Sequence, residues 1–287
     1  MSEHCSAPAA PELQADLERR FGGLRRLYGD ADYLRLRQSR VAVVGLGGVG
    51  SWAVEALARS GVARLVLIDL DQVAESNINR QVQALGSTVG QAKTEALRQR
   101  IGDIHPSCEV VAVEDFVQPD NWPALLPCEV DVLIDACDQV RAKATLAAWG
   151  AATGLPVVCV GAAGGKRRAE AVEVADLAEV THDPLLASLR QRLRQAARQA
   201  AEPGKGRSPG AAMGLRCVFS REIVAGAPAQ AEAGAPLACH GYGSSVAVTA
   251  TFGLVAAGEA LSLLLSASPA LKAPRIDLYS EAVRTGR

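Results

Sequence analysis

No two of the seven cysteines are spaced as Cys-x-x-Cys, the pairing on which structural zinc sites and short disulfide frameworks depend. We therefore expect neither a structural zinc site nor a fold held by disulfides. Cys137 and Cys159 lie inside apolar runs, as reduced and buried thiols do in cytoplasmic proteins. The first eight residues carry no basic stretch followed by an apolar one, so we also expect no signal peptide and a cytoplasmic location.

Aromatic residues and net charge are scarce as well. Phe, Trp and Tyr make up 4% of the 287 residues, and the formal net charge is −1. Any binding of nucleic acid must therefore depend on a local basic patch and on shape more than on base stacking. Apolar side chains are plentiful, at 49% of the residues, which is enough for a sizeable core in one large domain or two small ones.

One apolar run, 244–265, is long enough to cross a bilayer. Ser, Thr and Gly occur throughout it, and Glu259 lies in its C-terminal half, where a charge would be costly in lipid. We expect a helix of the core or of a subunit interface here, with membrane association as the less favoured alternative.

Short apolar runs alternate with helix-forming segments as far as Gly161. The expected strands are 41–44, 64–68, 109–113, 131–136 and 156–161, and the expected helices are 49–59, 91–101, 121–126 and 141–153. This alternation predicts an α/β fold, a doubly wound, mostly parallel, Rossmann-like sheet with helices on both faces.

Beyond Gly165 the pattern predicts a C-terminal extension of the same sheet. Strands are expected at 169–177 and 216–220, and between them a helix opens at Asp183-Pro184 and runs to Arg198. The expected organisation is a flexible tail at 1–19, one domain at 20–266 with a basic insertion at about 181–240, and a second tail at 267–287.

The stretch Gly45-Leu46-Gly47-Gly48-Val49-Gly50 follows the strand 41–44 directly and opens the helix 49–59. A glycine turn in this context directs backbone N–H groups and the positive end of a helix at a phosphate group. The next strand ends at Asp69, whose carboxylate is suited to accept hydrogen bonds from a ribose. The expected ligand is therefore an adenine nucleotide, bound by Gly45, Gly47, Gly48, Gly50 and Asp69.

The loop after Asp69 carries more polar groups than a simple nucleotide site requires. Asn77, Asn79, Arg80 and Gln81 lie within five residues, and the guanidinium of Arg80 offers a planar fork to phosphate oxygens. A solvated polar loop is the alternative interpretation. Four polar side chains directly beyond a nucleotide-binding strand favour a functional loop.

Lys93 and Asp138 are expected at the same edge of the sheet. Lys93 falls near the start of a helix, where a cation is unfavourable unless an anion such as phosphate lies nearby; a surface lysine is the alternative. Asp138 follows the strand 131–136 and can hold Mg²⁺ against nucleotide phosphates, cap the next helix, or do both. A nicotinamide-dependent dehydrogenase does not need phosphates held by a metal ion. An enzyme that cleaves a nucleoside triphosphate must neutralise the charge that develops on the phosphates, so these residues favour the second class.

These motifs, together with Asp71 and Asp135, resemble the ubiquitin-activating-enzyme-like superfamily of adenylating enzymes. Four further segments resemble one branch of it, the bacterial enzymes that dehydrate threonylcarbamoyladenosine in tRNA, and they are 20–29, 183–185, 217–220 and 249–253. The likeness covers roughly residues 20–266.

The resemblance implies ATP and Mg²⁺ as cofactors. Asp69 would hold the ribose, with Asp71 in the same cofactor site, and Asp138 would bind the metal. The phosphates would be bound by Asn77, Arg80, Gln81 and Lys93. A homodimer is also implied, in which Arg20, or else Arg26, of one subunit reaches the site of the other; a charged surface helix is the alternative for Arg20. The implied catalytic residues are Arg20, Arg80, Lys93 and Asp138.

The implied reaction is an ATP-dependent cyclisation next to the anticodon. The threonine carboxylate attacks the α-phosphate of ATP, and the carbamoyl oxygen then attacks the activated carbonyl and expels AMP. Because this second nucleophile is tethered, no covalent enzyme intermediate is required. Cys217 and Cys239 are the candidates if a cysteine takes part, although a core thiol is favoured for Cys217.

A tRNA partner should leave a basic patch in the sequence. Residues 181–222 contain eight basic and three acidic residues, and Lys166-Arg167-Arg168 adds a second basic cluster. A solvated helix face is the alternative, but the small number of opposing acids favours RNA contact.

Two other functions stay open. One is activation of the C-terminus of a ubiquitin-like or sulfur-carrier protein, against which the missing zinc cysteines argue; whether sulfur-transfer proteins are partners is also open. The other is a non-catalytic nucleotide-binding scaffold, against which the convergence of Arg80, Lys93 and Asp138 argues.

Overall fold

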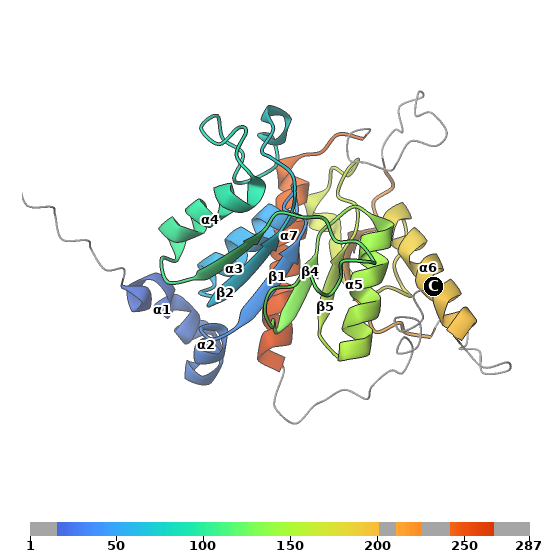
Figure 1. Ribbon diagram of the computed structural model, residues 1–287, viewed down its shortest axis with the longest axis horizontal. Coiled ribbons are helices and arrows are strands. Elements are labelled where there is room, and N and C mark those ends of the chain that lie inside the picture. Colours follow the sequence, from blue (N-terminus) through green and yellow to red (C-terminus); the bar gives the residue numbers. More distant parts are fainter. Residues whose placement is uncertain (1–15, 201–210, 225–241, 267–287) are drawn as a thin grey trace, which may run out of the picture.

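The computed structural model describes residues 16–200, 211–224 and 242–266. Within them, a seven-stranded sheet has the strand order β3-β2-β1-β4-β5-β7-β6 (Figure 1). The strands are β1 (Arg40–Val44), β2 (Arg64–Ile68), β3 (Glu109–Val113), β4 (Val132–Asp135), β5 (Val157–Val160), β6 (Val172–Asp176) and β7 (Arg216–Ser220). β6 runs antiparallel to β7, and every other neighbouring pair is parallel. The predicted mostly parallel sheet and its C-terminal extension are confirmed.

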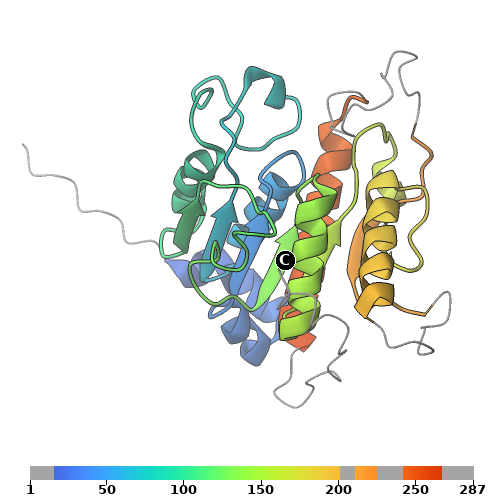
Figure 2. The same ribbon diagram turned by 45° about the vertical axis from the view of Figure 1, so that its right-hand side comes forward.

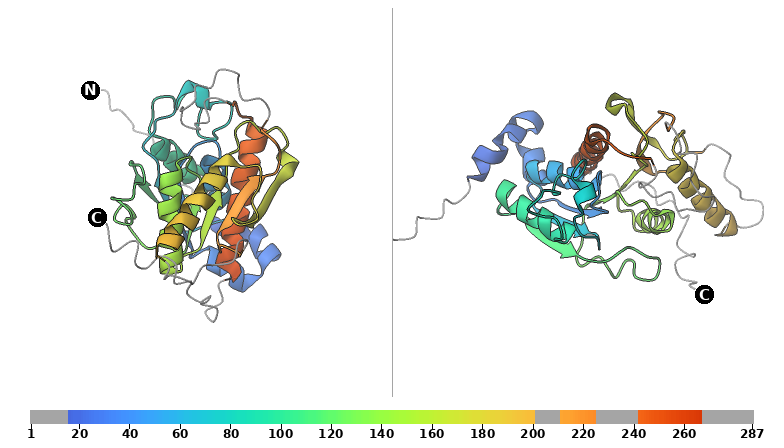
Figure 3. Two further views of the ribbon diagram at one scale, coloured as in Figure 1. Left: turned by 90° about the vertical axis from the view of Figure 1, so that its right-hand side faces the viewer. Right: turned by 90° about the horizontal axis from the view of Figure 1, so that it is seen from above.

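Helices lie on both sides of this sheet (Figures 2 and 3). They are α1 (Leu17–Tyr28), α2 (Asp30–Leu36), α3 (Gly50–Arg59), α4 (Lys93–Ile104), α5 (Val140–Thr153), α6 (Pro184–Ala200) and α7 (Val246–Ser266). Side chains of β1 alternate between the two faces, as the pleat requires. Val41 and Val43 belong to the apolar cluster that includes α3 and α7, whereas Ala42 and Val44 belong to the cluster with α5 and α6. Both faces of the sheet are therefore buried.

Three predicted boundaries were wrong. Residues 121–125 form turns instead of the helix expected at 121–126, because Pro123 disfavours helical backbone at the residue before it, Trp122. The Asn121 side chain accepts a hydrogen bond from the Gln118 N–H and donates one to the Phe116 carbonyl, which ties it to the preceding loop. Helix α1 begins at Leu17, so residues 17–19 belong to a helix and not to the expected tail. A 3₁₀ turn, Ala169–Ala171, replaces the first part of the strand expected at 169–177.

The long apolar run forms α7, a helix of the core. By length and composition α7 could cross a membrane, a property that buried helices of soluble proteins share. Its residues Val248, Phe252 and Ala256 are fully buried in the same cluster as α3. At Gly253 the two helices approach so closely that a Cβ would come 2.8 Å from the Cβ of Trp52. Close packing of this kind explains the small residues in the run.

Candidate active site

A cavity of about 600 Å³ lies at the carboxyl ends of β1, β2, β4 and β5. The loops that follow these strands and the start of α7 form its walls. In Figure 1 the loop between β2 and α4 lies at the top of the view, beside the upper end of α7. The predicted site residues that line the cavity are Gly45, Gly47, Gly48, Asp69, Asp71, Asn77, Arg80, Gln81, Lys93 and Asp138. Residues separated widely in the sequence are thus brought to one edge of the sheet.

The glycine turn forms the floor of the cavity. Gly45 has a φ of 85°, which favours glycine, and a Cβ there would come 2.8 Å from the backbone nitrogen of Cys137. A Cβ on Gly50 would collide with the carbonyl of Gly45, so Gly50 permits the tight turn and does not itself line the cavity. A Cβ on Gly47 would meet nothing within 4 Å, which shows that this glycine borders open space.

Asp69 is fixed by two backbone donors and lies beside a buried lysine. Its Oδ2 accepts from the Leu46 N–H at 2.6 Å, and its Oδ1 accepts from the Asp71 N–H at 2.8 Å. Lys93, the first residue of α4, places its Nζ 2.6 Å from Oδ2 of Asp71 and 3.8 Å from Oδ1 of Asp69. Burial raises the pKa of Asp69, and the charge of Lys93 opposes that shift. The anion expected beside Lys93 is therefore already supplied by protein carboxylates.

Arg80 is held over the glycine turn by neutral groups. Its guanidinium donates to the Ser76 carbonyl at 2.8 Å and to Oδ1 of Asn79 at 3.0 Å. A Cβ on Gly48 would come 3.2 Å from its Cγ, so the aliphatic part of the arginine packs on this glycine. The Trp52 indole N–H donates to the Arg80 carbonyl at 2.9 Å. These contacts fix the arginine at the cavity wall and leave its charge without a carboxylate partner among the described residues.

Asn77 and Gln81 have structural partners in addition to their place in the lining. Oδ1 of Asn77 accepts from the Ala74 N–H at 3.0 Å, which closes the 3₁₀ turn Glu75–Asn77. Oε1 of Gln81, a buried residue, accepts from the Gln83 side chain at 3.0 Å. The side-chain oxygens of Asn77 and Gln81 are thus engaged within the protein, and their amide nitrogens can donate hydrogen bonds to a ligand.

Asp138 is an exposed residue on the cavity wall, and its carboxylate makes no hydrogen bond or ion pair with the described part of the chain. The alternative that it caps the next helix is wrong, because the residue before α5 is Gln139 and no side chain caps that end. An exposed carboxylate on the wall of the cavity that holds Arg80 and Lys93 is a suitable Mg²⁺ ligand, since Mg²⁺ commonly takes one or two carboxylates together with phosphates.

Asp135 does not line the cavity but forms a buried ion pair beneath it. Nζ of Lys143 lies 3.1 Å from Oδ1 of Asp135 and 3.2 Å from the carbonyl oxygen of the same residue. Burial alone would lower the pKa of Lys143, but the Asp135 charge outweighs it and raises that pKa above its ordinary value. The Cys137 N–H and thiol also donate to Oδ1 of Asp135. Lys143 was not predicted as a functional residue, although a lysine among the alanines of α5 was a signal.

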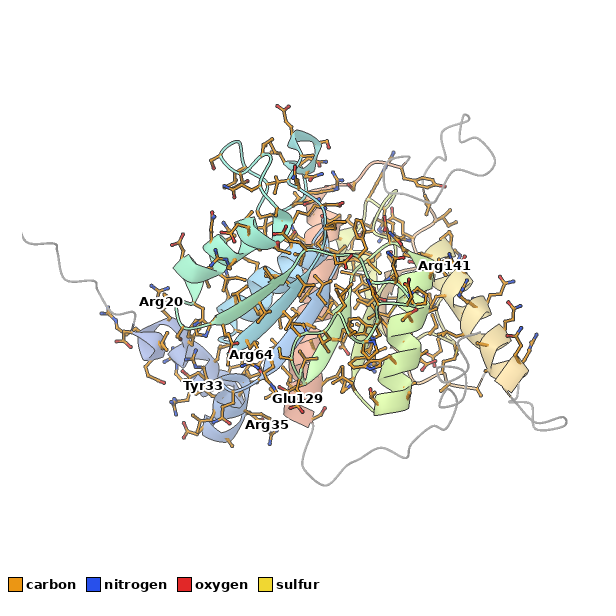
Figure 4. The ribbon with its side chains drawn as sticks, in the orientation of Figure 1. Arg20, Tyr33, Arg35, Arg64, Glu129 and Arg141 are labelled. Atoms are coloured by element: carbon orange, nitrogen blue, oxygen red, sulfur yellow. The ribbon has the colours of Figure 1, made fainter. Side chains whose placement is uncertain are left out.

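Arg20 lies apart from the cavity of its own subunit. Its guanidinium donates to the carbonyls of Asp103 and Ile104, at 2.6 and 2.7 Å, and so binds the C-terminal end of α4. That end of α4 precedes β3 and therefore lies at the edge of the sheet opposite to the site. Figure 4 shows Arg20 on α1, at the side of the molecule.

Several basic residues of the expected patch are engaged inside the protein. Lys166 is buried, and its ammonium group donates to the carbonyls of His182, Ser220 and Glu222, so it is not available to RNA. Arg216 and Arg221 form ion pairs with other elements. The basic residues that stay exposed on α6 are Arg192 and Arg198, and Arg167 and Arg168 of the second cluster are exposed as well. Lys205 and Arg207 lie outside the described residues. Within the described residues, Lys166 is therefore removed from the expected patch, and the charges of Arg216 and Arg221 are compensated by carboxylates.

Of the two candidate cysteines, the one that the structure describes gives no support to covalent catalysis. Cys217 is fully buried in β7, as expected of a core thiol. Cys239 and its neighbour His240 lie outside the described residues.

Known proteins match most of the chain. The tRNA threonylcarbamoyladenosine dehydratase of Escherichia coli (strain K12) is 41% identical over 86% of this chain and 94% of its own length. The protein of the same name from Haemophilus influenzae is 38% identical, with the same coverage of both chains.

Solved structures agree with this likeness. The E. coli tRNA N6-threonylcarbamoyladenosine dehydratase, TcdA, in complex with ATP has a TM-score of 0.76 and 40% identity, covering 88% of this chain and 96% of that chain. The structure of the same enzyme with AMP has a TM-score of 0.76 and 41% identity. The family model described as the ThiF family matches residues 21–285, and the chain belongs to that family.

Proposed function

We propose that this chain is an ATP-dependent dehydratase of N6-threonylcarbamoyladenosine in tRNA, acting next to the anticodon through adenylation of the threonine carboxylate. The observation that carries the proposal is the cavity in which Arg80, Lys93 and Asp138 gather beside a glycine turn. The dehydratases of E. coli and H. influenzae, 41% and 38% identical, support the same substrate. The ATP complex of the E. coli enzyme supports ATP as the co-substrate.

The first step would activate the carboxylate. With the ribose at Asp69 and the phosphates over the glycine turn, the threonine carboxylate attacks the α-phosphorus, and pyrophosphate leaves with the electron pair of the broken P–O bond. Arg80 neutralises charge that develops on the phosphate oxygens. Lys93 contributes mainly by holding Asp69 and Asp71 in place, because within the described residues its ammonium group pairs with these two carboxylates.

The second step would close the ring. The carbamoyl oxygen attacks the activated carbonyl, AMP leaves with one oxygen of the former carboxylate, and a nitrogen of the carbamoyl group loses a proton to solvent. The substrate thus loses one water in total, while ATP becomes AMP and pyrophosphate. Because both groups belong to one side chain, the reaction gains the high effective molarity of an intramolecular attack.

Asp138 is the proposed ligand of Mg²⁺. Its exposed carboxylate on the cavity wall fits the role, and within the described residues no group of three or more His, Cys, Asp or Glu could hold an ion without the nucleotide. When bound, the ion would neutralise phosphate charge.

We also propose three properties of the assembly. The enzyme is a homodimer in which Arg20 of one subunit serves the cavity of the other. The exposed arginines of α6, Arg192 and Arg198, contact tRNA phosphates. The enzyme works in the cytoplasm, in keeping with the five described cysteines, all free thiols. On family grounds alone, sulfur-transfer proteins are further candidate partners.

The test is to incubate the protein with ATP, Mg²⁺ and threonylcarbamoylated tRNA and to measure nucleosides by mass spectrometry. A nucleoside lighter by one water, formed with AMP, supports the proposal. We expect Arg80→Ala to reduce kcat at least about 100-fold, as loss of one charge-stabilising donor does. Arg98→Ala, which removes an exposed pair with Glu95 on α4, is the matched control and should keep normal activity. Pyrophosphate exchange that requires a carrier protein, with no tRNA product, would overturn the proposal.

A further inference from the structure

The cavity extends beyond the region that the nucleotide motifs define. Its nucleotide half lies over β2, β1 and β4, whereas a second part lies beyond the end of β5. We name this part the acceptor lobe and define it by Gly161–Gly164, Leu185, Val224 and Tyr242. β5 is two strands away from β1, so the lobe lies about 10 Å from the glycine turn at the usual strand spacing.

The acceptor lobe is spacious and carries no free charge. Its floor, Gly161–Gly164, has no side chain larger than a methyl group. The buried Asp183 lies directly beneath, but its carboxylate accepts from the Ala162 N–H at 2.9 Å and from the Leu186 N–H at 3.0 Å. Such a lobe fits a flat, largely neutral group better than a phosphate.

Tyr242 is the aromatic side chain of this lobe. Among the described residues that line the cavity, the other aromatic is Phe116, which follows β3 on the nucleotide side. In a chain with so few aromatic residues, one at each end of a single cavity suggests two flat ligands. Phe116 lies beyond Asp69, on the side of the proposed ribose site, and is thus assigned to the nucleotide, which leaves Tyr242 for a second ring.

The backbone around Tyr242 is fastened on both sides. The Gly165 N–H donates to the Gly243 carbonyl at 3.0 Å, and a Cβ on Gly165 would come 3.3 Å from the Cβ of Tyr242. On the other side, the Asn79 amide donates to the Ser244 carbonyl at 3.0 Å. Tyr242 is therefore held between the floor of the lobe and the loop that carries Arg80. A ring bound there could extend a carboxylate-bearing substituent toward the phosphates.

We propose that the acceptor lobe binds the adenine base of the modified nucleoside, stacked on the Tyr242 ring. The inference rests on the proposed function and adds the place where the substrate base is bound. A carboxylate can reach the α-phosphate only if its nucleoside leaves the stack of the RNA loop and enters the cavity, as in other enzymes that act on a base. The scarcity of aromatic residues then reflects recognition of one extruded base instead of a stacked series.

The experiment compares Tyr242→Ala, Tyr242→Phe and Phe116→Ala with the wild type, using threonylcarbamoylated tRNA. We expect Tyr242→Ala to lower kcat/KM for tRNA about 10- to 100-fold, the effect of losing one stacked base, with the Kd of ATP unchanged. Tyr242→Phe retains the ring and should keep near-normal kcat/KM. Phe116→Ala should instead weaken ATP binding.

The outcomes separate the two proposals. If the wild type dehydrates the tRNA and Tyr242→Ala does so equally well, the acceptor lobe is wrong and the proposed function stands. If Tyr242→Ala weakens ATP binding as much as it weakens tRNA use, Tyr242 serves the nucleotide and the inference is overturned. If the wild type itself yields no dehydrated nucleoside, the proposed function fails. Should Tyr242→Ala not fold, Tyr242→Leu provides the same loss of stacking with more of the packing retained.

Discussion

Replacing Lys143 by methionine tests the ion pair beneath the site. The side chains of Lys143 and Asp135 are 0% and 1% exposed, and Nζ lies 3.1 Å from Oδ1. Methionine keeps most of the length of the lysine side chain but leaves a buried carboxylate without a cation. Removing one partner of a buried pair costs about 3–5 kcal/mol of unfolding free energy. Because the N–H and thiol of Cys137 still donate to the carboxylate, we expect the lower end, about 3 kcal/mol.

Urea unfolding of Lys143→Met, Asp135→Asn and the double variant measures this effect. The double variant should lose less than the sum of the single losses, by about 1–3 kcal/mol, because the second substitution removes the orphaned charge. Arg216→Met is the control, since its pair with Glu259 leaves the arginine 53% exposed and should contribute less than about 1 kcal/mol. A loss below about 1 kcal/mol for Lys143→Met, or additive losses, would refute the reasoning.

Two further predictions concern the assembly and the pH dependence of stability. If Arg20 acts across a dimer, an equal mixture of the inactive variants Arg20→Ala and Asp138→Ala should recover about a quarter of wild-type activity. About half of the dimers are then mixed, and one of the two sites in each mixed dimer is intact. An absence of recovery would mean that Arg20 does not serve the site of the partner. Burial, followed by the charge of Arg37, lowers the pKa of His105 from 6.5 to about 4, so the unfolded chain binds a proton that the folded chain does not. Unfolding free energy should therefore fall as pH drops from about 7 toward 4, and His105→Gln should flatten that fall in chemical denaturation series.

Strands and the glycine turn could be predicted because their signals are local. β1 and β2 are short β-branched runs that end directly at glycine or aspartate, and their positions match the expected ranges. The turn at 121–126 could not be recognised in the same way. There, Pro123 is compatible with the first turn of a helix as well as with a loop, and the hydrogen bonds of the Asn121 side chain to the preceding loop cannot be read from composition.

The site was predictable to the extent that parallel strands bring their carboxyl ends together. That rule places Asp69, Arg80 and Asp138 on one cavity without any knowledge of packing. The same rule cannot tell which charged side chains are already paired with other groups of the protein. Lys166 counted toward a basic patch, yet it is buried against carbonyls that lie up to 56 residues away in the sequence. Gly50 belongs to the motif but acts through its packing against Gly45.

The two cations of the site differ in the charge that they can offer to a phosphate. Lys93 is 7% exposed at its side chain and lies between two carboxylates, so much of its charge is compensated before any ligand arrives. Arg80 is bound only by a carbonyl and an amide oxygen among the described residues, and neither carries a formal charge. Electrostatic stabilisation depends on preorganised charge that is not already neutralised. We therefore propose that Arg80 is the principal phosphate-binding cation and that Lys93 acts by fixing the carboxylates of Asp69 and Asp71. Sequence motifs alone do not distinguish the two basic residues in this way.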